Sequence, residues 1–280
     1  PLYPVYQQSW GFSAITLTTI FAVYALALLS TLLTVGSLSD HIGRKPILIA
    51  SLLLLIVGLV LFIVADSVPV LIAARVVQGI AAGAATGAMS AAIIDLQPDV
   101  STGPLLNSIA PSLGLAGGAL GAGLLVQLAP APEILVFALL IAAAAILAIE
   151  LLFVPETSAL RGFDSRRHLA STLLPRASIP KSVRAPFFLI APALFATWSL
   201  GGFHLSLGPS IIGTVFGVDN HIVGGLEIFA LFASGAVAAA AVRNGFPRTV
   251  MMTGATVLAA GVALTLVSVL LPPPPTPGGS

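Results

Sequence analysis

Long apolar runs separated by short polar connections dominate this chain. About 20 consecutive apolar residues are enough for a helix to cross a lipid bilayer, and the sequence contains eight runs of roughly this length. They predict membrane-spanning helices over residues 17–38, 46–64, 70–96, 105–128, 134–154, 185–206, 222–242 and 249–271. The expected fold class is therefore an all-α polytopic membrane protein.

The composition agrees with this pattern and excludes several functional classes. Hydrophobic residues make up 58% of the chain and charged residues only 8%, and the mean hydropathy is +1.09. A chain this apolar has too little polar surface to fold in water. The absence of cysteine excludes disulfides and thiolate metal sites. No HExxH, P-loop or nucleophile-elbow pattern is present, so we expect no enzyme activity, no cofactor and no nucleic-acid partner.

The basic residues are distributed unevenly between the two sides of the predicted membrane. If the loop at Asp40 is cytoplasmic, alternate connections place ten of the eleven Lys and Arg residues on that side, and the eleventh, Arg75, lies inside a span. Cytoplasmic loops retain Lys and Arg. The pattern predicts a multi-pass protein of the cell membrane with the Asp40 loop and a basic linker, residues 157–184, in the cytoplasm. The other side carries three carboxylates: Asp66, Glu133 and Asp219.

The spacing of the spans predicts four regions. Residues 1–156 form an N-terminal helical bundle, and residues 157–184 form the central linker, which contains Pro175 and Pro180. Residues 185–271 form a second bundle of three helices. The Pro- and Gly-rich tail, residues 272–280, is expected to be polyproline II or disordered.

The first connection between spans carries the densest polar motif. Gly43 permits a tight reversal of the backbone, Asp40 suits a position near a helix N-terminus, and Arg44 suits a forked contact with a carboxylate. Seven residues at fixed spacing match the loop signature GxLxDxxGR[RK]xxL of the major facilitator superfamily, which the chain resembles: Gly36, Leu38, Asp40, Gly43, Arg44, Lys45 and Leu48.

The resemblance implies a gating role for this loop. In that family the loop latches one access state, so Asp40 and Arg44, with Gly36, Gly43 and Lys45 around them, would be gating residues. An acid at the position of Asp95 pairs with the loop arginine, which predicts an ionic latch between Asp95 and Arg44. Two plainer interpretations stay open. Arg44 and Lys45 each gain about 1 kcal/mol from an anionic leaflet and thereby only fix the orientation, and Asp95 is an interfacial carboxylate that faces water.

A second motif surrounds the single basic residue inside a span. Residues 71–83 resemble the family's fourth-helix pattern LxxxRxxQGxxA, with Arg75 and Gln78 in the polar positions. Placing a fixed cation at this depth costs roughly 3 kcal/mol or more, which favours a functional role. We expect Arg75, with Gln78 one turn away, to face a proton-carrying acid or an anionic substrate. The alternative is that Arg75 extends outward to the membrane surface.

The next helix matches the family's antiporter pattern GxxxGPxxGG poorly. Ala110 and Leu115 stand at two of its glycine positions, which weakens the case for antiport. The remaining small residues suit either sliding or close static packing of helices. We expect a helix-packing role for Pro111, Gly114, Gly117 and Gly118.

The second bundle has few polar residues inside its spans. Glu227 lies about one and a half turns from a helix end, where partial desolvation suits a carboxyl to proton coupling. Histidine is the side chain suited to a proton switch near neutral pH, which makes His204 a second candidate, but a hydrogen-bonded or headgroup-level role is the favoured interpretation. The hairpin with Arg243 and Arg248 has no acid and is similar to a degenerate copy of the Asp40 loop.

Together these motifs predict a partial major facilitator fold with about eight of an expected twelve helices. The resemblance implies that the first span corresponds to the family's second helix and the last to its ninth. The implied function is secondary transport by alternating access, with proton-coupled efflux of a small drug-like or metabolite substrate. The alternatives are proton-symport uptake of a small solute and a non-transporting scaffold or sensor. The expected partners are a small-molecule substrate, protons and the lipid bilayer.

Overall fold

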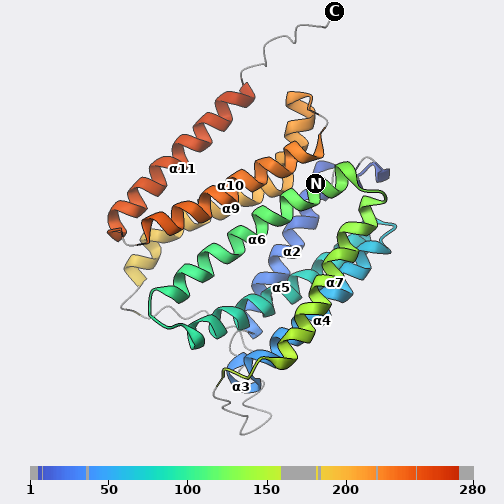
Figure 1. The fold of residues 1–280 in the computed structure, drawn as a ribbon. Helices are drawn as coiled ribbons and strands as arrows, with labels where there is room; N and C mark the ends of the chain where they lie inside the picture. The colour runs from blue at the N-terminus through green and yellow to red at the C-terminus, as the bar shows by residue number, and fades with distance from the viewer. Residues whose placement is uncertain are drawn as a thin grey trace, which may run out of the picture. The chain divides into compact units, whose positions relative to one another are not determined.

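Long helices account for almost all of the described structure. The computed structural model describes residues 6–7, 9–35, 38–158, 181, 184–218, 220–243 and 245–270. Within these ranges eight helices are long and apolar enough to cross a membrane, as the sequence predicts. The helices are α2 (Ala14–Val35), the short α3 (Ser39–Ile42), α4 (Arg44–Ile63), α5 (Val68–Leu96), α6 (Thr102–Leu128), α7 (Pro132–Phe153), α9 (Arg184–Phe216), α10 (His221–Val242) and α11 (Pro247–Leu270) (Figure 1).

The largest difference from the predicted spans concerns α9. The sequence predicts an end at Ser206, but the helix continues to Phe216 with Pro192 and Pro209 inside it. Proline removes one backbone hydrogen bond and disfavours a helix interior in water. In lipid the backbone must satisfy its own polar groups, so the helix continues through the proline. The predicted tail, most of the predicted linker and Gly36 lie outside the described residues.

Local sequence explains where several helices begin. Proline occupies the first turn of α5 and of α7, where its missing N–H costs nothing. Before α6, the Asp99 carboxylate accepts hydrogen bonds from the hydroxyl and backbone N–H groups of Ser101 and Thr102. The hydroxyl of Ser101 has the largest effect, followed by that of Thr102, and together these bonds lower the pKa of Asp99 to about 2.

The chain divides into two compact units. The N-terminal unit comprises the described residues of Leu2–Ser108 and Leu124–Ser178, and the C-terminal unit those of Ile109–Gly123 and Ile179–Ser280. In the N-terminal unit α5 packs against both α2 and α4, and α4 also packs against α7. In the C-terminal unit α10 packs along α9. The middle of α6 thus groups with α9 and α10.

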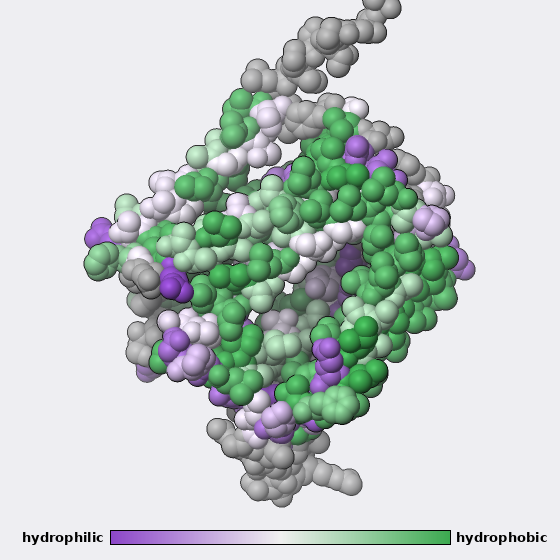
Figure 2. Space-filling model, viewed as in Figure 1, coloured by the Kyte–Doolittle hydropathy of each residue, from purple (hydrophilic) through white to green (hydrophobic). Residues whose placement is uncertain are grey.

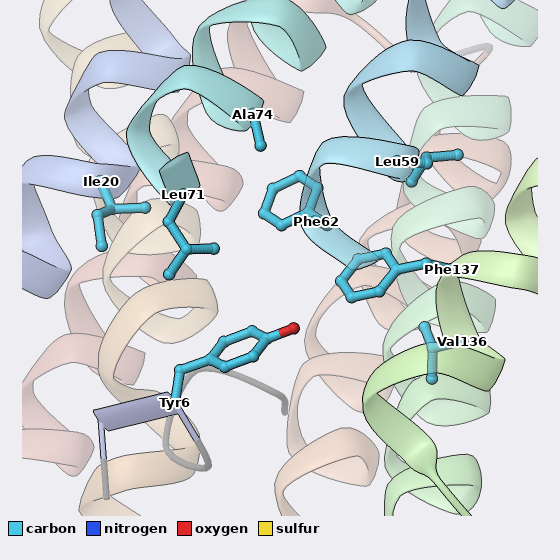
Figure 3. Close-up of a cluster of buried hydrophobic side chains, with 8 residues drawn as sticks. All are labelled: Tyr6, Ile20, Leu59, Phe62, Leu71, Ala74, Val136 and Phe137. Atoms are coloured by element: carbon cyan, nitrogen blue, oxygen red, sulfur yellow. The ribbon is translucent and has the colours of Figure 1, made fainter. Parts of the chain in front are cut away.

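A cluster of buried side chains joins four helices of the N-terminal unit (Figure 3). The rings of Phe62 on α4 and Phe137 on α7 stack with centroids 5.0 Å apart, and Ile20 on α2 and Leu71 on α5 are completely buried. Many large apolar side chains elsewhere are exposed, and hydrophobic residues cover most of the face in Figure 2. This surface suits contact with lipid.

Glycines allow α5 to approach α2 closely. A Cβ atom at Gly79 would lie 2.6 Å from the carbonyl oxygen of Tyr24, and one at Gly83 would lie 2.5 Å from that of Leu28. The two glycines are four residues apart on one helix face, the small-xxx-small arrangement of membrane helix contacts. At Gly114, Gly117 and Gly118 on α6, by contrast, an added Cβ would meet no described heavy atom within 4 Å, so their packing role stays a prediction.

We therefore expect Gly83→Ala to destabilise the N-terminal unit, because its methyl group overlaps the backbone of α2. The expected loss is about 1–3 kcal/mol, as for other overpacked sites, measured by thermal unfolding of the detergent-solubilised protein. Gly118→Ala is the matched control and should change stability by less than about 0.5 kcal/mol. Equal losses in both variants would contradict the contact between α2 and α5.

Candidate functional site

The α3–α4 connection gathers charged side chains around Arg44. The Nη1 atom of Arg44 lies 2.5 Å from Oδ1 of Asp40 and 2.6 Å from the Ser39 hydroxyl. Its Nε atom donates to Oδ2 of Asp95 at 3.2 Å. The Arg44 side chain is only 11% exposed. The expected contact between Arg44 and Asp95 is therefore present, and one guanidinium joins two carboxylates.

Glu156 forms the second half of this arrangement. Its carboxylate accepts hydrogen bonds from the backbone N–H groups of Arg44, at 2.8 Å, and Lys45, at 3.1 Å, and so occupies the N-terminus of α4. In return the Lys45 ammonium donates to the carbonyl oxygen of Leu152 at 2.7 Å, near the C-terminus of α7. Each helix end thus receives a charge of the sign that its dipole favours. We call Asp40, Arg44, Lys45, Asp95 and Glu156 the hairpin cluster.

Gly43 makes this geometry possible in two ways. Its backbone has φ 114°, a conformation that a side chain strongly disfavours. A Cβ atom at this position would also collide with Oε2 of Glu156. The glycine of the loop motif therefore provides both the reversal and the space for the carboxylate.

The hydrogen bonds also change the acidity of Glu156. Burial by itself opposes ionisation, but the backbone N–H groups of Ser158, Arg44, Lys45 and Thr157 all donate to the carboxylate, and the net effect lowers its pKa below the ordinary 4.5. The sequence motifs assign no role to this residue, and the preceding Pro155 is by itself a sufficient signal for a helix end. The available signal was an acid just past an apolar helix, on the same predicted side as the basic loop.

Arg75 is a basic residue within the membrane-spanning helix α5 of the N-terminal unit. Its Nη1 atom donates to Oε1 of Gln78 at 2.7 Å. The guanidinium carbon lies 5.0 Å from the ring centroid of Phe21, 5.4 Å from that of Tyr24 and 5.5 Å from that of Phe62. Cation–π attraction of this kind is worth up to about 2 kcal/mol when desolvated. The guanidinium therefore lies among rings of α2 and α4, and its functional role stays a prediction.

In the C-terminal unit the structure brings together two residues that the sequence suggested separately. The Nδ1 atom of His204 on α9 contacts Oε1 of Glu227 on α10, and the side chains are 17% and 24% exposed. Trp198, also on α9, is 74% exposed. Within the described ranges, no three His, Asp or Glu side chains lie close enough together to hold a metal ion.

Known proteins share this sequence pattern to different extents. A sequence model of the Major Facilitator Superfamily matches residues 1–276. The quinolone resistance protein NorA of Staphylococcus aureus strains Mu50, N315 and MW2 is 31% identical over 98 residues. That alignment covers 35% of this chain and 25% of NorA, so the chain matches about a quarter of the length of these curated relatives.

The lowered pKa of Glu156 predicts a pH-dependent contribution to stability. Because the native pKa lies below the unfolded value, the contribution is complete above pH 4.5 and is lost as the pH falls through the lower native pKa. We expect Glu156→Gln to cost about 1–3 kcal/mol at neutral pH and progressively less on acidification. Thermal unfolding of both proteins across this pH range measures the difference.

Glu150→Gln serves as the control, because Glu150 is an exposed carboxylate near the end of α7, six residues before Glu156. A penalty for Glu156→Gln that stays constant down to acid pH would contradict a role for the ionised carboxylate.

Proposed function

Because the chain belongs to the Major Facilitator Superfamily, we propose that it works as a secondary transporter by alternating access and exports a small drug-like or metabolite molecule in exchange for protons. The chain is a multi-pass membrane protein of a transporter family. The partial similarity to a quinolone resistance protein supports efflux. The basic loops support a cell-membrane orientation with the Asp40 loop and residues 157–184 in the cytoplasm.

The observation that carries the proposal is the position of Arg75. A permanent charge within an apolar helix costs roughly 3 kcal/mol or more, whereas an apolar side chain would fill the same place among Phe21, Tyr24 and Phe62 without that cost. Cation–π contacts and the Gln78 hydrogen bond hold the guanidinium in a fixed orientation. We assign Arg75 and Gln78 to the recognition of an anionic group on the substrate or to the control of a proton-carrying acid.

The hairpin cluster is proposed as the latch of one access state. Arg44 ties the α3–α4 connection to the end of α5 through Asp95, and Glu156 ties the start of α4 to the segment after α7. Charge-assisted hydrogen bonds are stronger and more directional than neutral ones. Movement of these helices relative to one another therefore requires the cluster to break and reform, which makes it a point of control.

Uptake by proton symport is the second candidate. The observation in its favour is that Ala110 and Leu115 occupy glycine positions of the antiporter pattern in α6. The two modes differ in the direction in which a proton gradient drives the substrate.

Transport of labelled candidate substrates into proteoliposomes tests the function with the protein expressed from its complete coding sequence. We expect accumulation driven by an outward-directed proton gradient, because an antiporter exchanges internal protons for external substrate. Accumulation driven only by an inward-directed gradient would indicate symport. Absence of gradient-dependent flux across a broad panel of drug-like and metabolite compounds would contradict the proposed transport.

Within the same assay Arg75→Lys should lower the rate markedly. Lysine keeps the charge but loses the planar fork and the ring stacking. Arg184→Lys, at the exposed first residue of α9, is the matched control and should transport normally.

The latch is tested by the accessibility of single cysteines, because the chain has none of its own. Cysteines at Gly114, Gly117 and Gly118 on α6 are suitable probes, since a side chain there meets no described atom within 4 Å. We expect Arg44→Ala and Asp40→Asn to change their labelling by a membrane-impermeant maleimide from each side. Asp66→Asn, in the α4–α5 connection, is the control and should leave labelling unchanged. Identical labelling in all variants would exclude a latch at Arg44.

A further inference from the structure

Among the described residues of the C-terminal unit, His204 and Glu227 are two titratable side chains that meet inside spans. His204 on α9 contacts Oε1 of Glu227 on α10 through its Nδ1 atom. Both side chains are mostly buried, and both helices are long and apolar enough to cross a membrane. The ring of His204 is nearly perpendicular to that of the adjacent Phe203, with an interplanar angle of 88° and ring centroids 5.4 Å apart.

The backbone around this pair leaves room for the carboxylate. Gly208 follows His204 by four residues, and a Cβ atom there would lie 2.6 Å from Oε2 of Glu227. Nearby, α9 and α10 approach so closely that a Cβ at Gly224 would lie 3.0 Å from Pro209. The carboxylate therefore fits between the helices because residue 208 has no side chain.

One carboxylate oxygen has spare hydrogen-bonding capacity. Oε1 of Glu227 contacts His204, but the buried Oε2 has no hydrogen-bond partner among the described residues. Burying an ionised carboxylate oxygen that accepts no hydrogen bond costs free energy. A protonated carboxyl group is neutral and avoids this cost. The surroundings of Oε2 thus favour the addition of a proton.

The charge of the pair depends on a single proton. A neutral imidazole that donates its Nδ1–H to an ionised carboxylate gives the pair a net charge of about −1. One further proton, on Nε2 of the ring or on Oε2 of the carboxylate, brings the net charge to zero. An apolar environment favours the neutral form, so the pair is suited to alternate between these two states.

The other titratable groups on the elements that pack around His204 and Glu227 lie at different levels of their helices. The α6 segment Ile109–Gly123, which packs on α10 at Gly225, contains no titratable residue. On α10, His221 precedes Glu227 by six residues, about 9 Å along the helix. Arg184 begins α9, and Arg248 lies in the first turn of α11. Among the described residues of these elements, His204 and Glu227 are therefore the groups placed to exchange a proton at this level.

We propose that His204 and Glu227 together form a proton-binding site that takes up and releases one coupling proton in each transport cycle. The proposal rests on the proposed function, because a coupling proton requires proton-driven transport. It adds His204 as the partner of Glu227 and Gly208 as the residue that makes room for the carboxylate. A purely structural contact, in which the pair only holds α9 to α10, is the alternative that the experiment must separate.

The test uses His204→Gln, whose amide still donates a hydrogen bond to Glu227 but does not titrate. If the pair binds the coupling proton, this variant shifts the pH dependence of proton-driven accumulation in proteoliposomes. If the contact is only structural, the pH profile of the variant matches that of the wild type, and the proposal is wrong.

Glu227→Gln gives the second arm. We expect loss of proton-driven accumulation with retention of substrate counterflow, which needs no net proton movement. Glu150→Gln, the same change at the exposed end of α7, should retain both activities. Proton-driven accumulation by Glu227→Gln equal to that of the wild type would overturn the site and leave the proposed transport intact.

Infrared spectroscopy detects protonation of the carboxyl group directly, so it tests the site even where the wild type transports none of the tested compounds. The pH-induced infrared difference spectrum of the wild type should contain a carboxylic-acid band that Glu227→Gln removes and that Gly208→Ala, which keeps both titratable groups, shifts. A spectrum unchanged in Glu227→Gln would refute the proton site independently of transport. Absence of flux with the band present would instead contradict the proposed function alone.

Discussion

The ends of α4, α5 and α7 meet at charged side chains that are placed against the helix dipoles and therefore need partners. Arg44 and Lys45 begin α4, where the dipole already carries positive charge, and Asp95 lies in the last turn of α5, where it carries negative charge. Each of these charges would destabilise its own helix end if it had no partner. Arg44 and Asp95 compensate one another, while Glu156 neutralises the N–H groups at the start of α4. The helix ends therefore depend on their partners, and removal of one group leaves another uncompensated. This mutual dependence is a reason for the cluster to act as a unit when helices move.

Arg75 and the His204–Glu227 pair differ in how the cost of removing their charge from water is reduced. The guanidinium of Arg75 is a fixed cation, and the bundle surrounds it with aromatic rings and an amide. The proton site that we propose at His204 and Glu227 would instead lose its net charge by binding a proton. A permanent charge is suited to bias the charge state of something else, whether substrate or acid, whereas a titratable pair is suited to carry the proton itself. The roles that we propose for the two sites follow from this difference in chemistry.

The sequence predicted those features that depend on local composition. Runs of about 20 apolar residues located the eight spans of the described structure, and the resemblance to the family predicted the contact between Arg44 and Asp95. The prediction from sequence failed where a local signal for a helix end is opposed by the need for hydrogen-bonded backbone in the membrane. Gly208 and Pro209 indicate a helix end in water, but α9 continues to Phe216 because lipid penalises open backbone groups. The contact of His204 with Glu227, and that of Glu156 with Arg44, join residues far apart in sequence, and no periodicity within one helix reveals them.

Glycines in this chain have two physical effects: some let helices pack closely, and others leave space for a charged side chain. Gly79 and Gly83 only bring two backbones together, as small residues do in many membrane helices. Gly43 and Gly208 have a further role, because an added Cβ at either position would meet a glutamate carboxylate, that of Glu156 in one case and of Glu227 in the other. A side chain at either glycine would displace the acid and alter its hydrogen bonds. Gly43 and Gly208 therefore help to fix where negative charge is held, because each leaves the space that a carboxylate occupies. At residue 208 the proposed proton site would therefore respond to the spacing between α9 and α10.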